Sequence, residues 1–299
     1  MLSVLQSFRN SLKKILSFGL VAAIAVACVP VSVKEKPVIS VSILPYKYFA
    51  ERIAGDNFEI QVITPPGVSP ETYEPTPKQI KDLSNSVIFF VNGNLIFEDH
   101  IIDKSEKRSE TLTVDLSKDI DLIVGEVIDH GDHVHLHGID PHHWLSPAEV
   151  RIQINTILKT LLEFDPDNKE MYMANYEDFT KDIDKLDNHI KGLLAHSPIK
   201  TFLIYHPAFT YFARTYGLEQ IALESDGKEP TGSHIKNIID VARKLNIHTI
   251  LVQSQFNTAS AEVVAAEISG KIEILNPLEE DWLAGMYAIS HTMQKALNP

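Results

Sequence analysis

The stretch 168–196 reads NKEMYMANYEDFTKDIDKLDNHIKGLLAH. Segments with alternating strand and helix patterns precede it and follow it in the sequence. It contains no proline, and its single glycine, Gly192, lies near its end. Apolar residues recur at steps of three and four: Tyr176, Phe179, Ile183, Leu186, Ile190 and Leu193. This spacing predicts one stripe along a helix, which would extend roughly 44 Å at about 1.5 Å per residue. A surface helix inside a single domain would show the same pattern and stays an alternative.

Strand-length apolar runs alternate with helical segments before this stretch. The strand candidates are rich in Val, Ile and Phe: Val38–Leu44, Phe58–Thr64 and Ser86–Asn92. They do not alternate cleanly between apolar and polar residues, which is typical of parallel strands covered by helices on both faces. Helices are predicted at Tyr46–Ala54 and Pro77–Leu83. Thr76 would cap the second helix, and Pro77 would occupy its first position.

The same alternation returns after the stretch. Strands are predicted at Thr201–Tyr205, Gln220–Leu223, His248–Gln253 and Lys271–Leu275. Helices are predicted at Pro207–Tyr216, Gly232–Leu245, Ala259–Ser269 and Glu280–Leu297. Strands that alternate with helices indicate a second α/β lobe, similar in size to the first.

A chain of 299 residues is longer than one compact core usually accommodates. We therefore predict an α/β fold with two lobes, each a mainly parallel sheet flanked by helices, joined by one long spine helix. The predicted boundaries are 37–167 for the N-terminal lobe, 168–196 for the linking helix and 197–299 for the C-terminal lobe.

The N-terminus has the pattern of a targeting segment. Arg9, Lys13 and Lys14 precede an apolar run, Ile15–Ala27, that is too short to span a membrane comfortably. The run ends in small residues directly before Cys28, the only cysteine of the chain. This junction resembles the lipobox of bacterial lipoproteins, in which the cysteine is acylated after cleavage.

We therefore predict a signal peptide over residues 1–27, lipidation of Cys28 and a tether over 28–36. Ala25 stands where lipoboxes prefer leucine, so an ordinary signal peptide or a short buried helix remains an alternative.

Composition excludes several classes of function. The sequence has 27 basic and 40 acidic residues, a net charge of −13, which disfavours binding to a phosphate backbone and hence to nucleic acid. A single cysteine excludes a disulfide framework and a CxxC zinc site within the chain. A metal site would have to use His, Asp, Glu, Asn or Gln.

Six of the 13 histidines fall between His130 and His143. Four of them form a tract with glycine and aspartate over residues 130–138: His130, His133, His135 and His137. Gly and Asp predict a mobile loop here rather than a strand or helix. Because neutral imidazole binds borderline transition metals, such a loop fits auxiliary metal collection. A solvated polar loop is the alternative.

Other candidate ligands follow predicted strands or turns. His206 directly follows the strand 201–205, at the edge where open α/β sheets bind ligands. His142 follows Asp140-Pro141, and Glu71 lies in a proline-rich loop after the strand 58–64. Ordinary turn residues and solvent-facing glutamates would fit the same positions.

Three segments that contain these candidate ligands carry a family resemblance: GVSPETYEPTPKQI (67–80), DPHHWLSP (140–147) and YHPAFTYFARTYGL (205–218). Their order and spacing resemble the solute-binding proteins of zinc and manganese ABC transporters, known as cluster A-I. The resemblance covers residues from Val38 to the C-terminus. It implies two α/β lobes joined by a rigid helix, with a metal ion bound in the cleft between them.

The resemblance also implies a ligand set. His142 and His206 match family ligands, whereas Glu71 stands where the family usually has histidine. Asn276 stands where the family has an acid, so the fourth ligand is open between Asn276, a nearby acid and water. His143 is expected to point elsewhere, either beside the site or at the surface.

We thus predict high-affinity extracytoplasmic binding of a divalent transition metal and its delivery to an ABC permease with its ATPase. The histidine-rich loop is typical of the zinc branch and favours Zn²⁺, with Mn²⁺ or Fe²⁺ as alternatives. The protein would be a monomer, held by its lipid anchor on the periplasmic or cell-surface face. HExxH, GxSxG and a phosphate-binding glycine loop are all missing, so we predict no enzyme. A zinc-dependent hydrolase and an adhesin are the rival classes.

Overall fold

The computed structural model describes residues 36–105, 110–124, 127–129, 134–136, 138–224 and 229–298. For residues 103–105, 127–129 and 134–136 it describes the backbone only. The predicted signal peptide, Cys28, and three histidines of the tract, His130, His133 and His137, lie outside the described residues.

The first lobe is built on a parallel sheet with the strand order β2-β1-β3-β4. Its strands are β1 (Val38–Val41), β2 (Glu59–Val62), β3 (Ile88–Val91) and β4 (Leu112–Asp115). The first three were predicted. The edge strand β4 was not, because it is half-exposed and lacks a run of large apolar residues.

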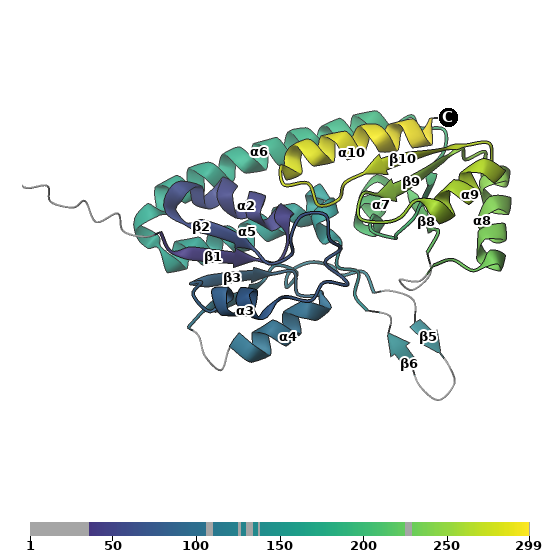
Figure 1. Ribbon diagram of the computed structural model, residues 1–299. Coiled ribbons are helices and arrows are strands. Elements are labelled where there is room, and N and C mark those ends of the chain that lie inside the picture. The colour runs from purple at the N-terminus through teal and green to yellow at the C-terminus, as the bar shows by residue number, and fades with distance from the viewer. Residues whose placement is uncertain are drawn as a thin grey trace, which may run out of the picture. The chain divides into compact units, whose positions relative to one another are not determined.

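Helices cover both faces of this sheet (Figure 1). They are α2 (Leu44–Ala54), α3 (Pro77–Leu83), α4 (Ile96–Ser105) and α5 (Pro147–Phe164). Helix α3 begins as predicted: the Gln79 side chain accepts a hydrogen bond from Thr76 N at 2.9 Å, while Thr76 caps Gln79 N. This capping box fixes the end of the proline-rich loop that carries Glu71.

The second lobe repeats the design with the strand order β10-β9-β7-β8, all parallel. Its strands are β7 (Thr201–Ile204), β8 (Glu219–Ala222), β9 (Thr249–Gln253) and β10 (Lys271–Leu275). Its helices are α7 (Thr210–Tyr216), α8 (Gly232–Leu245), α9 (Ala259–Glu267) and α10 (Trp282–Leu297). Among the described residues, none of the helices combines the length and apolar character needed to cross a bilayer.

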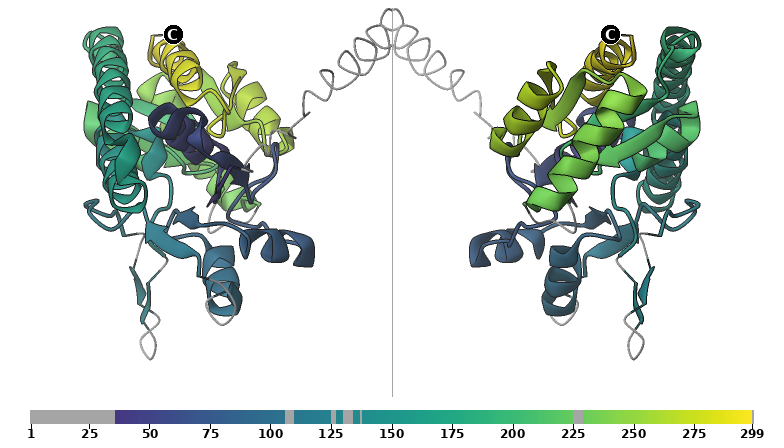
Figure 2. Two further views of the ribbon diagram at one scale, coloured as in Figure 1. Left: turned by 90° about the vertical axis from the view of Figure 1, so that its left-hand side faces the viewer. Right: turned by 90° about the vertical axis from the view of Figure 1, so that its right-hand side faces the viewer.

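Helix α6 (Lys169–Leu194) runs alongside both lobes, next to α10 (Figures 1 and 2). It packs against α2 and α5 of the first lobe and against α10 of the second. Four residues of its predicted stripe are buried and two, Tyr176 and Leu193, are half-buried. Phe179 of this stripe packs between Phe49 and Trp282. One continuous hydrophobic core includes Phe90 of β3, Phe179 and Ile204 of β7. The two lobes therefore share apolar packing rather than only a covalent linker.

The histidine tract is not entirely a loop, which corrects the prediction. Strands β5 (Val127–Asp129) and β6 (Val134–Leu136) pair antiparallel, with Val127 opposite Leu136 and Asp129 opposite Val134. Figure 1 shows this hairpin extending away from both sheets. Valine and isoleucine beside the histidines favour extended pairing, which outweighs the turn preference of Gly and Asp.

Candidate metal centre

Three side chains from separate segments converge between the lobes: Glu71, His142 and His206. Glu71 lies in the loop between β2 and α3, His142 directly precedes the 3₁₀ turn His143–Leu145, and His206 follows β7. One potential ligand atom of each lies within 4.8 Å of the others. They form the one group of three or more His, Cys, Asp or Glu side chains with this geometry in the described part of the chain.

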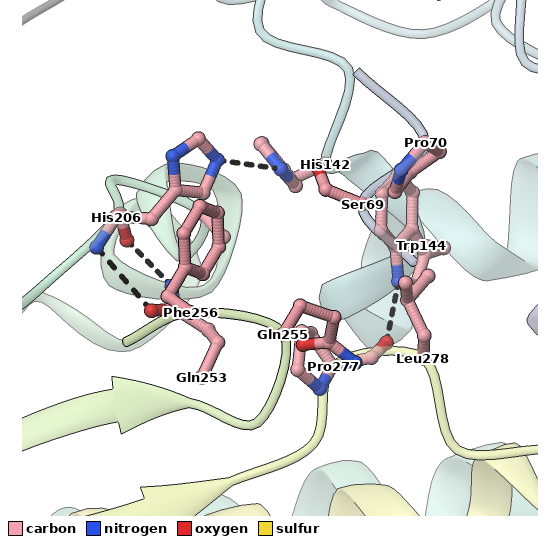
Figure 3. A pocket seen from close by; sticks show the side chains of 11 residues that line it. Ser69, Pro70, His142, Trp144, His206, Gln253, Gln255, Phe256, Pro277 and Leu278 are labelled. Atoms are coloured by element: carbon pink, nitrogen blue, oxygen red, sulfur yellow. Dashed lines mark hydrogen bonds between the residues drawn. The ribbon is translucent and has the colours of Figure 1, made fainter. Parts of the chain in front are cut away.

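The two imidazoles face each other across a short gap (Figure 3). Their Nε2 atoms lie 3.3 Å apart, and their rings meet edge to face. Glu71 Oε1 lies 3.3 Å from His142 Nε2, and Glu71 Oε2 lies 3.1 Å from His206 Nε2. Both histidines are buried, with 6% and 7% of their surface exposed.

A carboxylate stands behind each imidazole. Asp140 Oδ1 lies 2.9 Å from His142 Nδ1 and also accepts a hydrogen bond from the His142 backbone N–H. Glu224 Oε1 lies 2.6 Å from His206 Nδ1. A carboxylate at Nδ1 fixes the proton on that nitrogen, so the Nε2 lone pair points at the centre. Neither Asp140 nor Glu224 was predicted to take part. Asp140 begins the segment 140–147 that carries the resemblance, which could have indicated it, whereas no local pattern distinguishes Glu224 from other acids.

The electrostatics favour a cation at this point. Burial acts to lower the pKa of His206, but hydrogen bonds to Glu224 and Glu71 outweigh it and raise the pKa to about 9. Burial acts to raise the pKa of Glu71, yet the charges of His142 and His206 leave it below its ordinary value. The pKa of Asp140 is likewise lowered, because its contacts with His142 outweigh burial. The site thus keeps its carboxylates ionised and attracts either a proton or a metal ion.

Side chains from the second sheet hold His206. Gln253, at the end of β9, donates from Nε2 to the His206 carbonyl at 2.6 Å and accepts from the His206 N–H at 3.2 Å. Its amide thereby extends the pairing between β9 and β7 by one residue. The Phe256 ring stacks on the His206 ring, with centroids 5.0 Å apart. His206 is therefore held at its backbone by Gln253, at its Nδ1 by Glu224 and on one face of its ring by Phe256.

The loop carrying His142 is tied to both lobes. Asn92 Nδ2, after β3, donates to the Pro141 carbonyl at 2.9 Å. From the second lobe, the Tyr211 hydroxyl of α7 donates to the Asp140 carbonyl at 2.9 Å. Trp144 Nε1 donates to the Pro277 carbonyl at 2.8 Å. These contacts leave little freedom for His142 to leave its position.

His143 points away from the centre, but it is fully buried rather than at the surface. Its Nδ1 lies 2.6 Å from Gln153 Nε2. Burial lowers the pKa of His143 to about 3, so the ring is neutral at physiological pH. It supports the loop beside the site, one of the two positions expected for it.

The fourth candidate, Asn276, has its amide engaged elsewhere. Its Oδ1 accepts hydrogen bonds from Gln255 Nε2 at 2.8 Å and from Leu278 N at 3.1 Å. Its Nδ2 donates to Glu279 Oε2 at 3.0 Å. Both lone pairs of the Asn276 oxygen are thus in use, and the ligand role of Asn276 stays a prediction.

A small pocket that is open to solvent adjoins the two histidines (Figure 3). It is lined by Ser69 and Trp144 on the side of the first lobe and by Gln255, Phe256 and Leu278 on the other. The pocket opens one side of the His142–His206 pair to small ligands or water.

The histidine tract connects directly to this centre. Only the backbone of His135, in β6, is described. Val124 bridges Ile139 at the base of the hairpin, and Asp140 N then donates to the Ile123 carbonyl. The base of the hairpin at Ile139 is therefore followed directly by Asp140, the residue that contacts His142.

Comparison with known proteins agrees with this architecture. The model of the family "Zinc-uptake complex component A periplasmic", ZnuA, matches residues 39–296. The high-affinity zinc uptake system protein ZnuA of Bacillus subtilis is 31% identical over 79% of this chain and 76% of its own length. The zinc-binding lipoprotein AdcA of Streptococcus pneumoniae is 30% identical over 85% of this chain, which spans 53% of that relative. The manganese-binding lipoprotein MntA of Halalkalibacterium halodurans is 29% identical over 74% of each.

Solved structures show the same likeness. A crystal structure of ZnuA superposes with a TM-score of 0.81 at 35% identity, covering 88% of this chain and all of that one. The periplasmic zinc-binding protein TroA of Treponema pallidum shares the fold, with a TM-score of 0.76 at 18% identity over 88% of this chain and all of that one.

Fold and site together define a solute-binding protein of the class that serves zinc and manganese ABC transporters. Within that class, the chain belongs to the ZnuA family of zinc-uptake components.

Proposed function

We propose that this protein binds one divalent transition-metal ion, zinc above all, between its lobes and delivers it for import. The ligands would be Nε2 of His142, Nε2 of His206 and the carboxylate of Glu71. The observation that carries the proposal is the 3.3 Å approach of the two Nε2 atoms, each backed by a carboxylate at Nδ1. In their neutral forms both rings direct an Nε2 lone pair to one point beside the Glu71 carboxylate, and this arrangement attracts a proton or a metal cation to that point.

The donor set favours zinc. Two imidazoles and one carboxylate bind Zn²⁺ at about 2.0–2.2 Å, with a fourth position left for water. The histidine tract next to the site supports the same choice, since imidazole prefers borderline metals. Manganese is the second candidate, because oxygen donors suit it and relatives of this chain include manganese-binding lipoproteins. Iron(II) would fit the same ligands.

Delivery requires a membrane partner. Relatives named as zinc- and manganese-binding lipoproteins support an extracytoplasmic place for this chain, with Cys28 as lipid anchor. The partner would be an ABC permease with its ATPase, and the protein would act as a monomer. No turnover is expected, although zinc hydrolases use a similar His₂–carboxylate set.

Capture and release would depend on the loop of Glu71 more than on movement of whole lobes. His142 and His206 are buried and held by neighbours from both sheets, while Glu71 is only half-buried. The shared core along α6 resists a wide hinge motion. Movement of the Glu71 loop would remove one ligand and leave a weaker two-histidine site.

The test is metal analysis of the purified protein, followed by competitive titration with Zn²⁺ and Mn²⁺. We expect one tight site that prefers zinc, with stoichiometric retention and no hydrolytic turnover. Deletion of residues 130–137 should leave this site largely intact. Tight binding that persists after His142→Ala and His206→Ala are combined would disprove the assignment.

A further inference from the structure

Glu98, in the first turn of α4, is a buried carboxylate outside the group of proposed ligands. Only 2% of its surface is exposed, and no described basic side chain forms an ion pair with it. Its Oε1 accepts hydrogen bonds from Asn92 N at 2.7 Å and from the Ser42 hydroxyl. Its Oε2 accepts from Gly93 N at 2.8 Å and from Leu95 N at 3.4 Å. One carboxylate thus satisfies four donors, from the end of β1 and from the turn after β3.

The turn held by Glu98 begins with Asn92, which contacts the loop of His142. The Asn92 side chain is fully buried, and its Nδ2 donates to the Pro141 carbonyl at 2.9 Å. Its Oδ1 accepts a hydrogen bond from Asn94 N at 3.2 Å, which keeps the NH₂ on the side of Pro141. Pro141 directly precedes His142, so a shift of the turn would move the group that anchors this proposed ligand.

The turn is also packed on its other side. Gly93 has a φ of 86°, and a Cβ at this position would overlap Asp115 Oδ1 and lie 2.7 Å from Ser117 Oγ. Asp115 itself accepts hydrogen bonds from the Ser117 backbone N–H at 2.7 Å and from the Ser117 hydroxyl at 2.8 Å. The turn therefore lies between Glu98 and the end of β4, and its position depends on both.

The charge of Glu98 is not offset by its surroundings. Burial raises the pKa of Glu98 to about 7, although its four hydrogen bonds act to lower it. Burial, followed by the charges of Glu98 and Asp115, raises the pKa of Tyr46 on α2 well above its ordinary value. Burial lowers the pKa of His143 to about 3. Both groups are neutral near pH 7, and Asp115 is a second acid. The fold therefore disfavours the ionised form of Glu98, so stability alone does not explain an acid at this position.

We propose that the ionised carboxylate of Glu98 is a positioning group for the metal site. It holds the turn after β3 so that Asn92 keeps the Pro141 carbonyl, and with it His142, in the binding position. A protonated carboxyl carries an O–H donor in place of an acceptor, so acid weakens its hold on the N–H groups of the turn. This inference rests on the proposed function and adds to it a residue that acts on His142 from a distance.

The first experiment measures the zinc affinity of Glu98→Gln by competitive titration between pH 5.5 and pH 8.5. Glutamine keeps the size of the side chain but turns an NH₂ toward a backbone N–H. We expect affinity to fall by about tenfold at pH 8.5, the lower end for loss of a group that orients a metal ligand. The ratio of wild-type to variant affinity should shrink as the pH falls, because Glu98 of the wild type then loses its charge too. Asp99→Asn, an exposed acid in the same first turn, is the matched control and should bind zinc like the wild type.

A second experiment tests whether Glu98 acts through Asn92. Asn92→Ala should lower zinc affinity by about 10–100-fold. The double variant with Glu98→Gln should lose no more than Asn92→Ala alone, because both changes break one chain of contacts. Ser42→Ala keeps the carboxylate but removes a hydrogen bond that lowers the pKa of Glu98. Its affinity relative to the wild type should therefore dip near pH 7 and recover at pH 8.5.

Three results would each overturn the inference: wild-type affinity in Glu98→Gln, an affinity ratio that stays constant from pH 5.5 to pH 8.5, or additive losses in the double variant. Thermal unfolding of the metal-free variants shows whether they fold. If Glu98→Gln does not fold, Ser42→Ala supplies the test, and a wild-type pH profile in that variant would contradict the role of Glu98. The proposed function fails separately, when tight binding persists after His142→Ala and His206→Ala are combined.

Discussion

His142 Nε2 and His206 Nε2 lie 3.3 Å apart, although 64 residues separate them in the chain. One ring comes from the first lobe and the other from the end of a strand in the second. Each ring has a carboxylate at its far nitrogen, so that in their neutral forms both present an Nε2 lone pair to the same point. A metal ion at that point would connect the two lobes through two buried, hydrogen-bonded side chains.

Removing either imidazole should abolish tight binding. We expect His142→Ala and His206→Ala each to lower zinc affinity by at least about 100-fold, since each would delete a proposed ligand and leave its carboxylate unpaired. Competition against a chromophoric chelator measures the change. His196→Ala, an exposed histidine after α6, is the control and should have no effect. Wild-type affinity in either site variant would contradict the ligand assignment.

Glu71 should set the preference between metals. Glu71→Gln keeps the size of the side chain but removes its charge, and we expect zinc affinity to fall about tenfold and manganese affinity to fall further. Glu71→His introduces the residue usual in the resembled family and should raise the zinc-to-manganese affinity ratio. Parallel titrations with both ions measure this ratio. An unchanged ratio in both variants would mean that Glu71 does not ligate.

Metal binding should release a proton near neutral pH. The pKa of His206 is about 9 in the metal-free protein, so its ring is protonated at pH 7 and must become neutral to bind. Affinity should therefore rise with pH, by up to about tenfold per pH unit, and level off near pH 9. Calorimetry in buffers of different ionisation enthalpy counts the protons released. Affinity that is constant between pH 6 and 8 would contradict this.

Glu224→Gln tests the cause of that proton release. Without the carboxylate, the pKa of His206 should fall toward its ordinary value of 6.5, because its strongest favourable partner is lost. Fewer protons should then be released at pH 7, even as zinc affinity drops by about 10–100-fold. Glu219→Gln, an exposed acid at the start of β8, is the control. Unchanged proton release in Glu224→Gln would show that another group titrates.

The two lobes should unfold as one unit. Phe179 is fully buried in α6 and packs on Phe49 and Trp282, so Phe179→Ala should cost about 3–5 kcal/mol of unfolding free energy. Because one hydrophobic core includes residues of both lobes, a single cooperative transition is expected in denaturant, before and after the substitution. Circular dichroism and tryptophan fluorescence should give the same midpoint. Two separated transitions would mean that the lobes are independent.

Local sequence patterns were enough to predict most of the fold. The apolar runs of β1, β3, β7 and β9 are covered on both faces, and the stripe of α6 is long enough to predict one continuous helix. That this helix packs against both lobes was not decided by the stripe, because a surface helix of one domain would show the same pattern. The search for apolar runs missed β4, because this strand is half-exposed and has no run of large apolar residues. It also missed the β5–β6 hairpin, where strand pairing prevails over the turn preference of Gly and Asp.

For the site, the sequence by itself determined which imidazoles stand at strand ends and turns, because strand boundaries are encoded locally. Only the tertiary structure decided that Glu71, His142 and His206 meet within 4.8 Å, and that Asp140 and Glu224 stand behind the rings. It also decided that Asn276 turns its oxygen to Gln255. The physical reason is that a side chain's orientation depends on partners far away in the chain, and no local periodicity encodes those contacts.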